Sequence, residues 1–90
     1  MTDTLENYRN EINKIDKLLV DIIKQRMKLS LKIGKYKKDN NMEILNSNRE
    51  KEVVNKINEY NKKETEIILE DEFIKDLWTT LMNYSKRLQI

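Results

Sequence analysis

The stretch that decides the fold runs from Leu5 to Tyr36 and reads LENYRNEINKIDKLLVDIIKQRMKLSLKIGKY. Apolar residues recur along it at alternating intervals of three and four residues, and Arg26 is the one charged residue among them. The residues of this stripe, which we call the seam, are Leu5, Tyr8, Ile12, Ile15, Leu19, Ile22, Arg26, Leu29, Ile33 and Tyr36. Such a heptad pattern predicts one continuous helix from about Thr4 to Lys38.

The predicted helix is too long for a chain of 90 residues to cover. It measures about 50 Å, whereas a compact domain of this size is about 30 Å across. Because the rest of the chain has too few residues to bury the whole seam, we expect a second copy of the chain to cover it. The expected assembly is a homodimer.

Two further helices are predicted after a loop at Met42–Asn46. The second begins near Asn46 or Ser47, where Ser47 and Glu50 have the spacing of a capping box, and it ends in the polar run Asn61–Glu64. The third extends from about Thr65 to Gln89. Its two adjacent stripes are Ile67, Ile74, Leu77, Leu81, Tyr84 and Leu88, and Trp78, Met82, Ser85 and Gln89. We therefore expect an all-α fold of a long, a short and a long helix, in one domain of residues 1–90.

The composition excludes several classes of protein. The chain has no Cys and no His, which removes disulfide scaffolds, Cys/His zinc sites, thiol nucleophiles and His-based triads, and we expect no metal. No apolar run exceeds three residues and the first ten residues show no signal region, so we expect a cytoplasmic protein without membrane contact. Its 18 basic and 16 acidic residues are interspersed, which disfavours nucleic-acid binding.

Arg26 is the clearest exception to the apolar pattern, because it lies on the seam between Ile22 and Leu29. A charge at such a position is unfavourable unless it is matched. One explanation is an ion pair that sets the register of two helices, and the other is a pocket for an anion. Lys37 favours the pocket, since it lies on nearly the same helix face about 16 Å further along the axis. Taken alone, Lys37 is also explained as a solvated residue at the end of a helix.

Three other residues, Ser85, Gln89 and Gly34, are also exceptions to the expected pattern. Ser85 and Gln89 turn an apolar face of the third helix polar, which either a binding site or fraying at the terminus explains. Gly34, inside the first helix, predicts the close approach of another backbone or of a ligand. The polar residues that interrupt the apolar pattern include no nucleophile paired with a base and no pair of carboxylates. They indicate either a binding module for a small dianion or an enzyme whose reaction needs no proton transfer.

These residues also carry a resemblance to a known family. The matching runs and positions are Tyr8–Asp16, Arg26, Ile33–Lys37, Asn48–Glu52, Ser85 and Gln89. The pattern resembles the all-helical class of chorismate mutases, and the resemblance spans Arg9 to Gln89. It implies an intertwined homodimer with a helical-bundle core and two active sites. It also implies the Claisen rearrangement of chorismate to prephenate, in phenylalanine and tyrosine biosynthesis, without a cofactor.

The resemblance assigns catalytic roles to Lys37 and Gln89, which would stabilise the ether oxygen of chorismate. Lys37 would also reach a carboxylate of the substrate. Arg26 would bind a carboxylate with help from Ser85, and Arg49 would support the same end of the pocket.

Three further positions complete the implied site. Glu50 would accept a hydrogen bond from the ring hydroxyl, and Asn46 stands where the family usually has Asp. Arg9 would serve the opposite subunit, in trans. Geometry supports that last role independently, because Arg9 and Arg26 are about 25 Å apart along one straight helix.

Two alternatives remain open. The first is an isochorismate pyruvate lyase, whose fold and pocket are similar; Glu50 disfavours it, because an apolar residue tends to occupy that position in the lyase branch. The second is a non-catalytic helical dimerisation module that uses the same seam.

Overall fold

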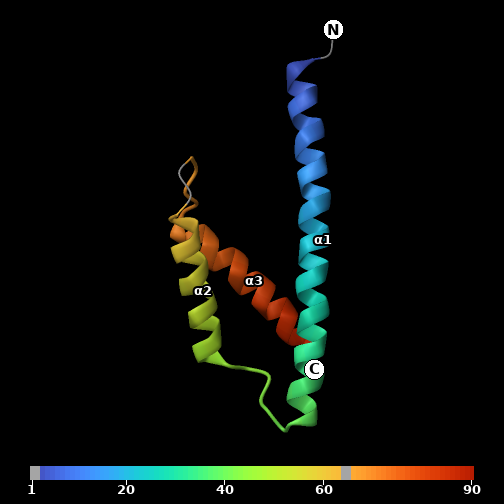
Figure 1. Ribbon diagram of the computed structural model, residues 1–90, viewed down its shortest axis with the longest axis vertical. Coiled ribbons are helices and arrows are strands. Elements are labelled where there is room, and N and C mark those ends of the chain that lie inside the picture. The colour runs from blue at the N-terminus through green and yellow to red at the C-terminus, as the bar shows by residue number, and fades with distance from the viewer. Residues whose placement is uncertain (1–2, 64–65) are drawn as a thin grey trace.

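The computed structural model describes residues 3–63 and 66–90. Within them lie three helices, α1 (Thr4–Asp39), α2 (Ser47–Asn61) and α3 (Asp71–Gln89), which Figure 1 shows from blue to red. This arrangement confirms the predicted all-α class of three helices; α1 is long and α2 is short, while α3, with 19 residues, is shorter than predicted. None of the helices, in these two ranges, is long and apolar enough to cross a membrane.

The ends of α1 follow from its capping residues. Asp3 is the N-cap, and its carboxylate accepts a hydrogen bond from the backbone N–H of Leu5 at 3.1 Å. At the other end the Asn40 side chain donates to the carbonyl of Tyr36 at 2.8 Å, and Asn41 adopts a left-handed φ of 54°. Asn tolerates that conformation better than most residues, so the helix stops here, one residue beyond the predicted end.

The start of α2 is as predicted, but the predicted cap is wrong. Asn46 is the N-cap, and its side-chain oxygen accepts a hydrogen bond from the N–H of Arg49 at 3.0 Å. Ser47 is already the first helical residue, so it forms no capping box with Glu50. An amide oxygen caps a helix as well as a hydroxyl does. Asn46 occupies the N-cap position, directly before the first helical residue, whereas Ser47 lies inside the helix. The Glu50 carboxylate is consequently not engaged in capping.

The predicted start of the third helix is also wrong. Thr65 and the end of the polar run at Glu64 lie outside the described residues, but Ile67–Glu70 is not helical and α3 begins only at Asp71. The cause is Asn61, whose side chain accepts a hydrogen bond from the N–H of Leu69 at 2.9 Å and donates to its carbonyl at 2.7 Å. Both backbone groups of Leu69 are therefore bound outside a helix, although Ile67 has the spacing of the α3 stripe.

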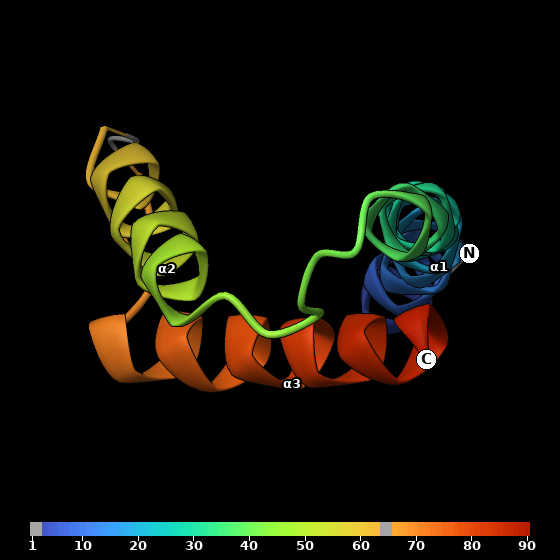
Figure 2. The same ribbon diagram turned by 90° about the horizontal axis from the view of Figure 1, so that it is seen from below.

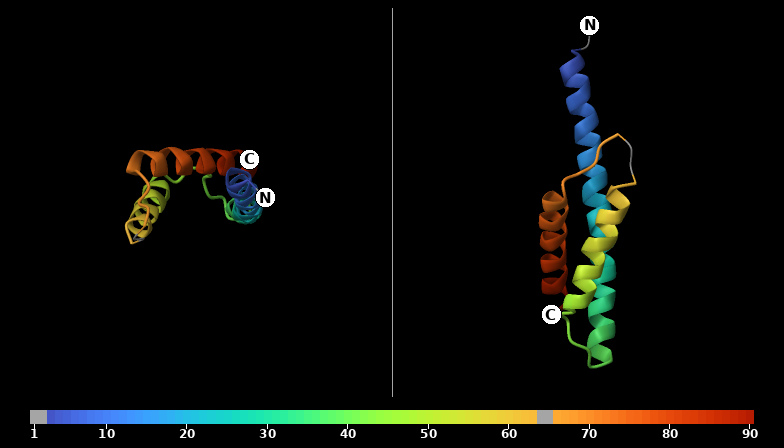
Figure 3. Two further views of the ribbon diagram at one scale, coloured as in Figure 1. Left: turned by 90° about the horizontal axis from the view of Figure 1, so that it is seen from above. Right: turned by 90° about the vertical axis from the view of Figure 1, so that its left-hand side faces the viewer.

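α3 joins the other two helices. In the part of the chain described, α1 and α2 each pack on α3 rather than on one another. Figure 2 shows α1 and α2 rising from the same side of α3. Figure 3 shows the N-terminal half of α1 extending beyond the rest of the chain. The seam there is uncovered: Ile12 is 55% exposed and Ile22 is 59% exposed.

The contact between α1 and α3 is close because of Gly34. A Cβ atom on Gly34 would lie 2.9 Å from the Cα of Gln89, well inside an ordinary contact distance. This confirms the prediction that another backbone approaches Gly34. Beside it, the buried hydroxyls of Ser30 and Ser85 are hydrogen bonded to each other. The last turn of α3 is thus fixed against α1.

Candidate active site

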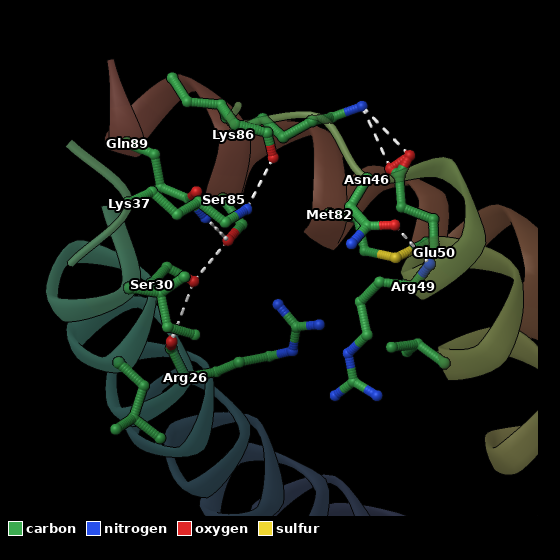
Figure 4. A pocket seen from close by; sticks show the side chains of 14 residues that line it. Arg26, Ser30, Lys37, Asn46, Arg49, Glu50, Met82, Ser85, Lys86 and Gln89 are labelled. Carbon is green, nitrogen blue, oxygen red and sulfur yellow. Dashed lines mark hydrogen bonds and ion pairs between the residues drawn. The ribbon is translucent and has the colours of Figure 1, made fainter. Parts of the chain in front are cut away.

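A cavity of about 330 Å³ lies between α1 and α2, over the C-terminal part of α3. Figure 4 shows its lining from close by. Its polar residues are Arg26, Ser30, Lys37, Asn46, Arg49, Glu50, Ser85, Lys86 and Gln89, and its apolar residues are Leu29, Ile33, Ile44, Val53 and Met82. Seven of the eight site residues predicted from the sequence are therefore brought together here, although they come from three helices and a loop.

Arg9 is the predicted residue that does not line this cavity. It lies on α1 in the N-terminal half that extends away from α2 and α3, about 25 Å from Arg26 along the helix axis. No side chain spans that distance, so within one chain Arg9 cannot reach the site.

Arg26 and Arg49 face the same gap between α1 and α2 (Figure 4). Arg49 pairs with the exposed Glu52 at 2.9 Å, whereas Arg26 has no acidic partner among the described residues. Burial of Arg26 lowers the pKa of its guanidinium, and the charge of Arg49 lowers it further. A half-buried guanidinium group and a more exposed one that repel each other favour an anion between them.

Lys37 shapes the cavity as well as charging it. Its Nζ donates a hydrogen bond to the backbone carbonyl of Ile44 at 2.7 Å, which holds the loop between α1 and α2 against the site. An ammonium group has three donors, so two remain for a ligand.

Ser85 and Gln89 are held by a short hydrogen-bonded chain. The Ser30 hydroxyl bonds to Ser85 and to the carbonyl of Arg26, and the Gln89 Nε2 donates to the Ser85 hydroxyl at 3.4 Å. The Gln89 Oε1 is buried and has no hydrogen-bond partner within the described residues. Because Ser85 is buried and Gln89 packs on Gly34, the terminal turn is ordered, so fraying does not explain these polar residues.

Glu50 is the single carboxylate in the lining, which also includes four cationic side chains: Arg26, Lys37, Arg49 and Lys86. Lys86 Nζ lies 3.3 Å from one Glu50 oxygen and 3.2 Å from the other. The lining therefore carries an excess of three positive charges, which suits a small ligand with two negative charges. No group of three or more acidic side chains in residues 3–63 and 66–90 is placed to hold a metal ion.

Two polar residues of the site were missed from the sequence. Ser30 lies one turn after Arg26 and one turn before Gly34, so the spacing of those two exceptions could have indicated it. Lys86 gave no such signal, because a lysine next to Ser85 near the end of a helix is typical of a solvated surface.

The fold and the site define an all-helical protein with a cationic pocket. Comparison with known families identifies the class more closely, since residues 8–90 match the family described as chorismate mutase type II. The chain belongs to this family, which confirms the resemblance inferred from the sequence.

Two curated relatives come from Buchnera aphidicola, and both are named bifunctional chorismate mutase/prephenate dehydratase. The protein of the subspecies from Acyrthosiphon pisum is 34% identical over 82 residues, which cover 91% of this chain and 20% of the relative. That of the subspecies from Schizaphis graminum is 41% identical over 59 residues, covering 66% of this chain and 15% of the relative. The chain thus spans a fifth or less of the length of these relatives.

Proposed function

We propose that this chain catalyses the rearrangement of chorismate to prephenate. The observation that carries the proposal is the gathering of Arg26, Lys37, Arg49, Ser85 and Gln89 around one cavity, with Glu50 as its single carboxylate. Chorismate presents two carboxylates, a ring hydroxyl and an ether oxygen, and the lining offers a matching group for each of them.

In the proposed complex the carboxylates fix the conformation of the substrate. Arg26, assisted by the Ser85 hydroxyl, binds one carboxylate, and Arg49 supports the same end of the pocket. A planar guanidinium can bind a carboxylate through two parallel hydrogen bonds, so it fixes orientation as well as position. Holding the substrate in its compact diaxial conformer removes much of the entropic part of the barrier.

Lys37 and Gln89 act at the bond that breaks. As the C–O bond lengthens, negative charge grows on the ether oxygen, and donors aimed at it stabilise the transition state more than the ground state. A pericyclic rearrangement needs no base and no covalent intermediate. The absence of Cys and His from the sequence is therefore compatible with the reaction.

Glu50 and Asn46 serve the ring hydroxyl in this proposal. Glu50 accepts its hydrogen bond. The oxygen of Asn46 is already used to cap α2, so the part of its side chain that remains for the substrate is the amide N–H₂ group, a donor. Asn in place of the usual Asp therefore preserves the cap, and hydroxyl recognition depends mainly on Glu50.

The proposed active unit is an intertwined homodimer with Arg9 supplied in trans. The exposed seam of α1 supports it, because a row of half-exposed apolar side chains is unfavourable in water and is covered by an equivalent helix in heptad packing. Arg9 of the partner subunit would then reach the pocket that Arg9 of the same chain cannot. The expected cytoplasmic location stays a prediction.

The test is a spectrophotometric assay of chorismate consumption with identification of the product. Prephenate is the expected product. Activity on isochorismate that yields salicylate and pyruvate would instead identify a lyase. No turnover of either compound by a folded dimer would leave the chain as a dimerisation module.

A further inference from the structure

Lys86 is a charged residue of the pocket for which the proposed reaction has no role. It lies in the last turns of α3, and its side chain crosses to the start of α2, where its ammonium group meets both oxygens of Glu50 (Figure 4). The Lys86 side chain is 31% exposed and that of Glu50 is 28% exposed. The pair is thus partly withdrawn from water, where an ion pair is screened less than on an open surface.

Among the described residues, no other cation forms an ion pair with Glu50. Arg49, its neighbour in the sequence, binds Glu52 instead, and Lys56 binds Glu52 at 2.8 Å. Within 4.0 Å of the Glu50 carboxylate, among the residues described, Lys86 is the one cationic side chain. The orientation of the carboxylate therefore depends on this single contact between α2 and α3.

The geometry of the contact leaves Glu50 free to act as an acceptor. Lys86 donates a hydrogen bond to Oε1, whereas Oε2 lies 3.2 Å from the same ammonium group but is buried and has no hydrogen-bond partner among the described residues. Oε2 therefore keeps its lone pairs for a donor from the ligand. A free glutamate side chain rotates about three bonds, and a ligand that needs one rotamer must meet the entropic cost of selecting it. The contact with Lys86 already restricts the Glu50 side chain in the free protein, so ligand binding loses less conformational entropy.

We infer that Lys86 is a positioning residue, which holds the Glu50 carboxylate in the orientation that accepts the hydrogen bond of the ring hydroxyl. Lys86 itself does not contact the substrate. This inference rests on the proposed function. It adds to the site an α2–α3 ion pair that links hydroxyl recognition to the packing of the two helices.

A double-mutant cycle tests the inference, with Lys86→Met, Glu50→Gln and their combination, all checked for helicity and dimer formation. We expect Lys86→Met to lower kcat/KM for chorismate by about tenfold, since hydrogen bonds to charged groups are among the stronger ones. The loss should fall mainly on KM, because the hydroxyl takes no part in bond breaking. In the Glu50→Gln background, the same substitution should change kcat/KM by less than about twofold.

Two further variants complete the experiment. Lys86→Arg keeps a cation that can meet both oxygens, so it should recover most of the activity. Lys62→Met, at the exposed C-terminal end of α2, removes the same charge at the end of that helix opposite to Glu50 and should leave turnover unchanged.

An equal loss in both backgrounds would overturn the inference, because Lys86 would then act on the substrate or on the fold. Full activity of a folded Lys86→Met dimer would overturn it as well. If Lys86→Met does not fold, Lys86→Gln takes its place in the same cycle with the same criteria. A wild-type chain without mutase activity would refute the proposed function itself, and this inference with it.

Discussion

Replacing Gly34 with Ala should damage catalysis more than stability. An added Cβ atom would lie 2.9 Å from the Cα, Cβ and Cγ atoms of Gln89, whereas an ordinary contact needs at least 3.4 Å. One of the contacted atoms belongs to the backbone, so rotation of a side chain cannot relieve the clash. The end of α3 must therefore move away from α1 by roughly 0.5 Å, which is the difference between the two distances.

Two opposing terms determine the stability of the variant. Ala is favoured over Gly inside a helix by about 1 kcal/mol. Overpacking of a tight contact costs about 1 to 3 kcal/mol. The free energy of unfolding should consequently fall by no more than about 2 kcal/mol, which a marginally stable domain can tolerate.

The catalytic rate, unlike the free energy of unfolding, gains nothing from the higher helix propensity of Ala. A displacement of 1 Å in an active site can cost about a hundredfold in rate, so a shift of half that size at Gln89 should lower kcat by about tenfold. The assay is steady-state turnover of chorismate beside thermal unfolding at equal protein concentration, because dimer stability depends on concentration. Lys35→Ala, on the exposed face of the same turn, is the control. A Gly34→Ala variant that is more stable and turns over normally would refute the reasoning.

Three further predictions concern the proposed site. Arg26→Lys keeps the charge but removes the planar fork, so kcat/KM should fall by at least tenfold, about 1.4 kcal/mol, in a dimer that remains folded; unchanged turnover would make Arg26 a register-setting residue. Mixing inactive Arg9→Ala and Lys37→Ala chains should restore about a quarter of the wild-type activity, since half of the dimers are mixed and one of their two sites is intact. Mixed dimers that form but stay inactive would refute the contribution in trans. Gln89→Glu should lose activity as the pH rises, because only the neutral carboxyl can donate to the ether oxygen; pH-independent turnover near the normal rate would show that this side chain does not contact it.

The sequence predicted the fold because the seam is long and regular. Alternating intervals of three and four over ten positions leave few alternatives to one helix, and the polar residues after Lys38 end it where expected. The start of α3 could not be predicted in the same way. Ile67 fits the helical stripe by its spacing alone, and a hydrogen-bonded pair between Asn61 and Leu69, eight residues apart, overrides that spacing.

The site was predictable where a polar residue conflicts with an apolar pattern. Arg26, Ser85 and Gln89 all interrupt an apolar stripe, and all of them line the cavity. Ser30 and Lys86 also line it, but neither occupies a position where the pattern requires an apolar residue. Their partners, Ser85 and Glu50, are 55 and 36 residues away in the sequence, so the contacts appear only in three dimensions.

The position of the cavity follows from a second stripe on α1 that the seam obscures. Met27, Ser30 and Gly34 also recur at intervals of three and four, and they form the buried face that packs on α3. The seam residues Arg26, Leu29 and Ile33 lie beside this stripe and line the cavity. α1 therefore has one face that packs on its own α3 and an exposed apolar face that the proposed dimer would cover, and the pocket lies where the two faces adjoin. Substitutions on the second stripe should disturb Gln89 within a chain, whereas substitutions in the exposed part of the seam should disturb the dimer, so the two faces can be tested separately.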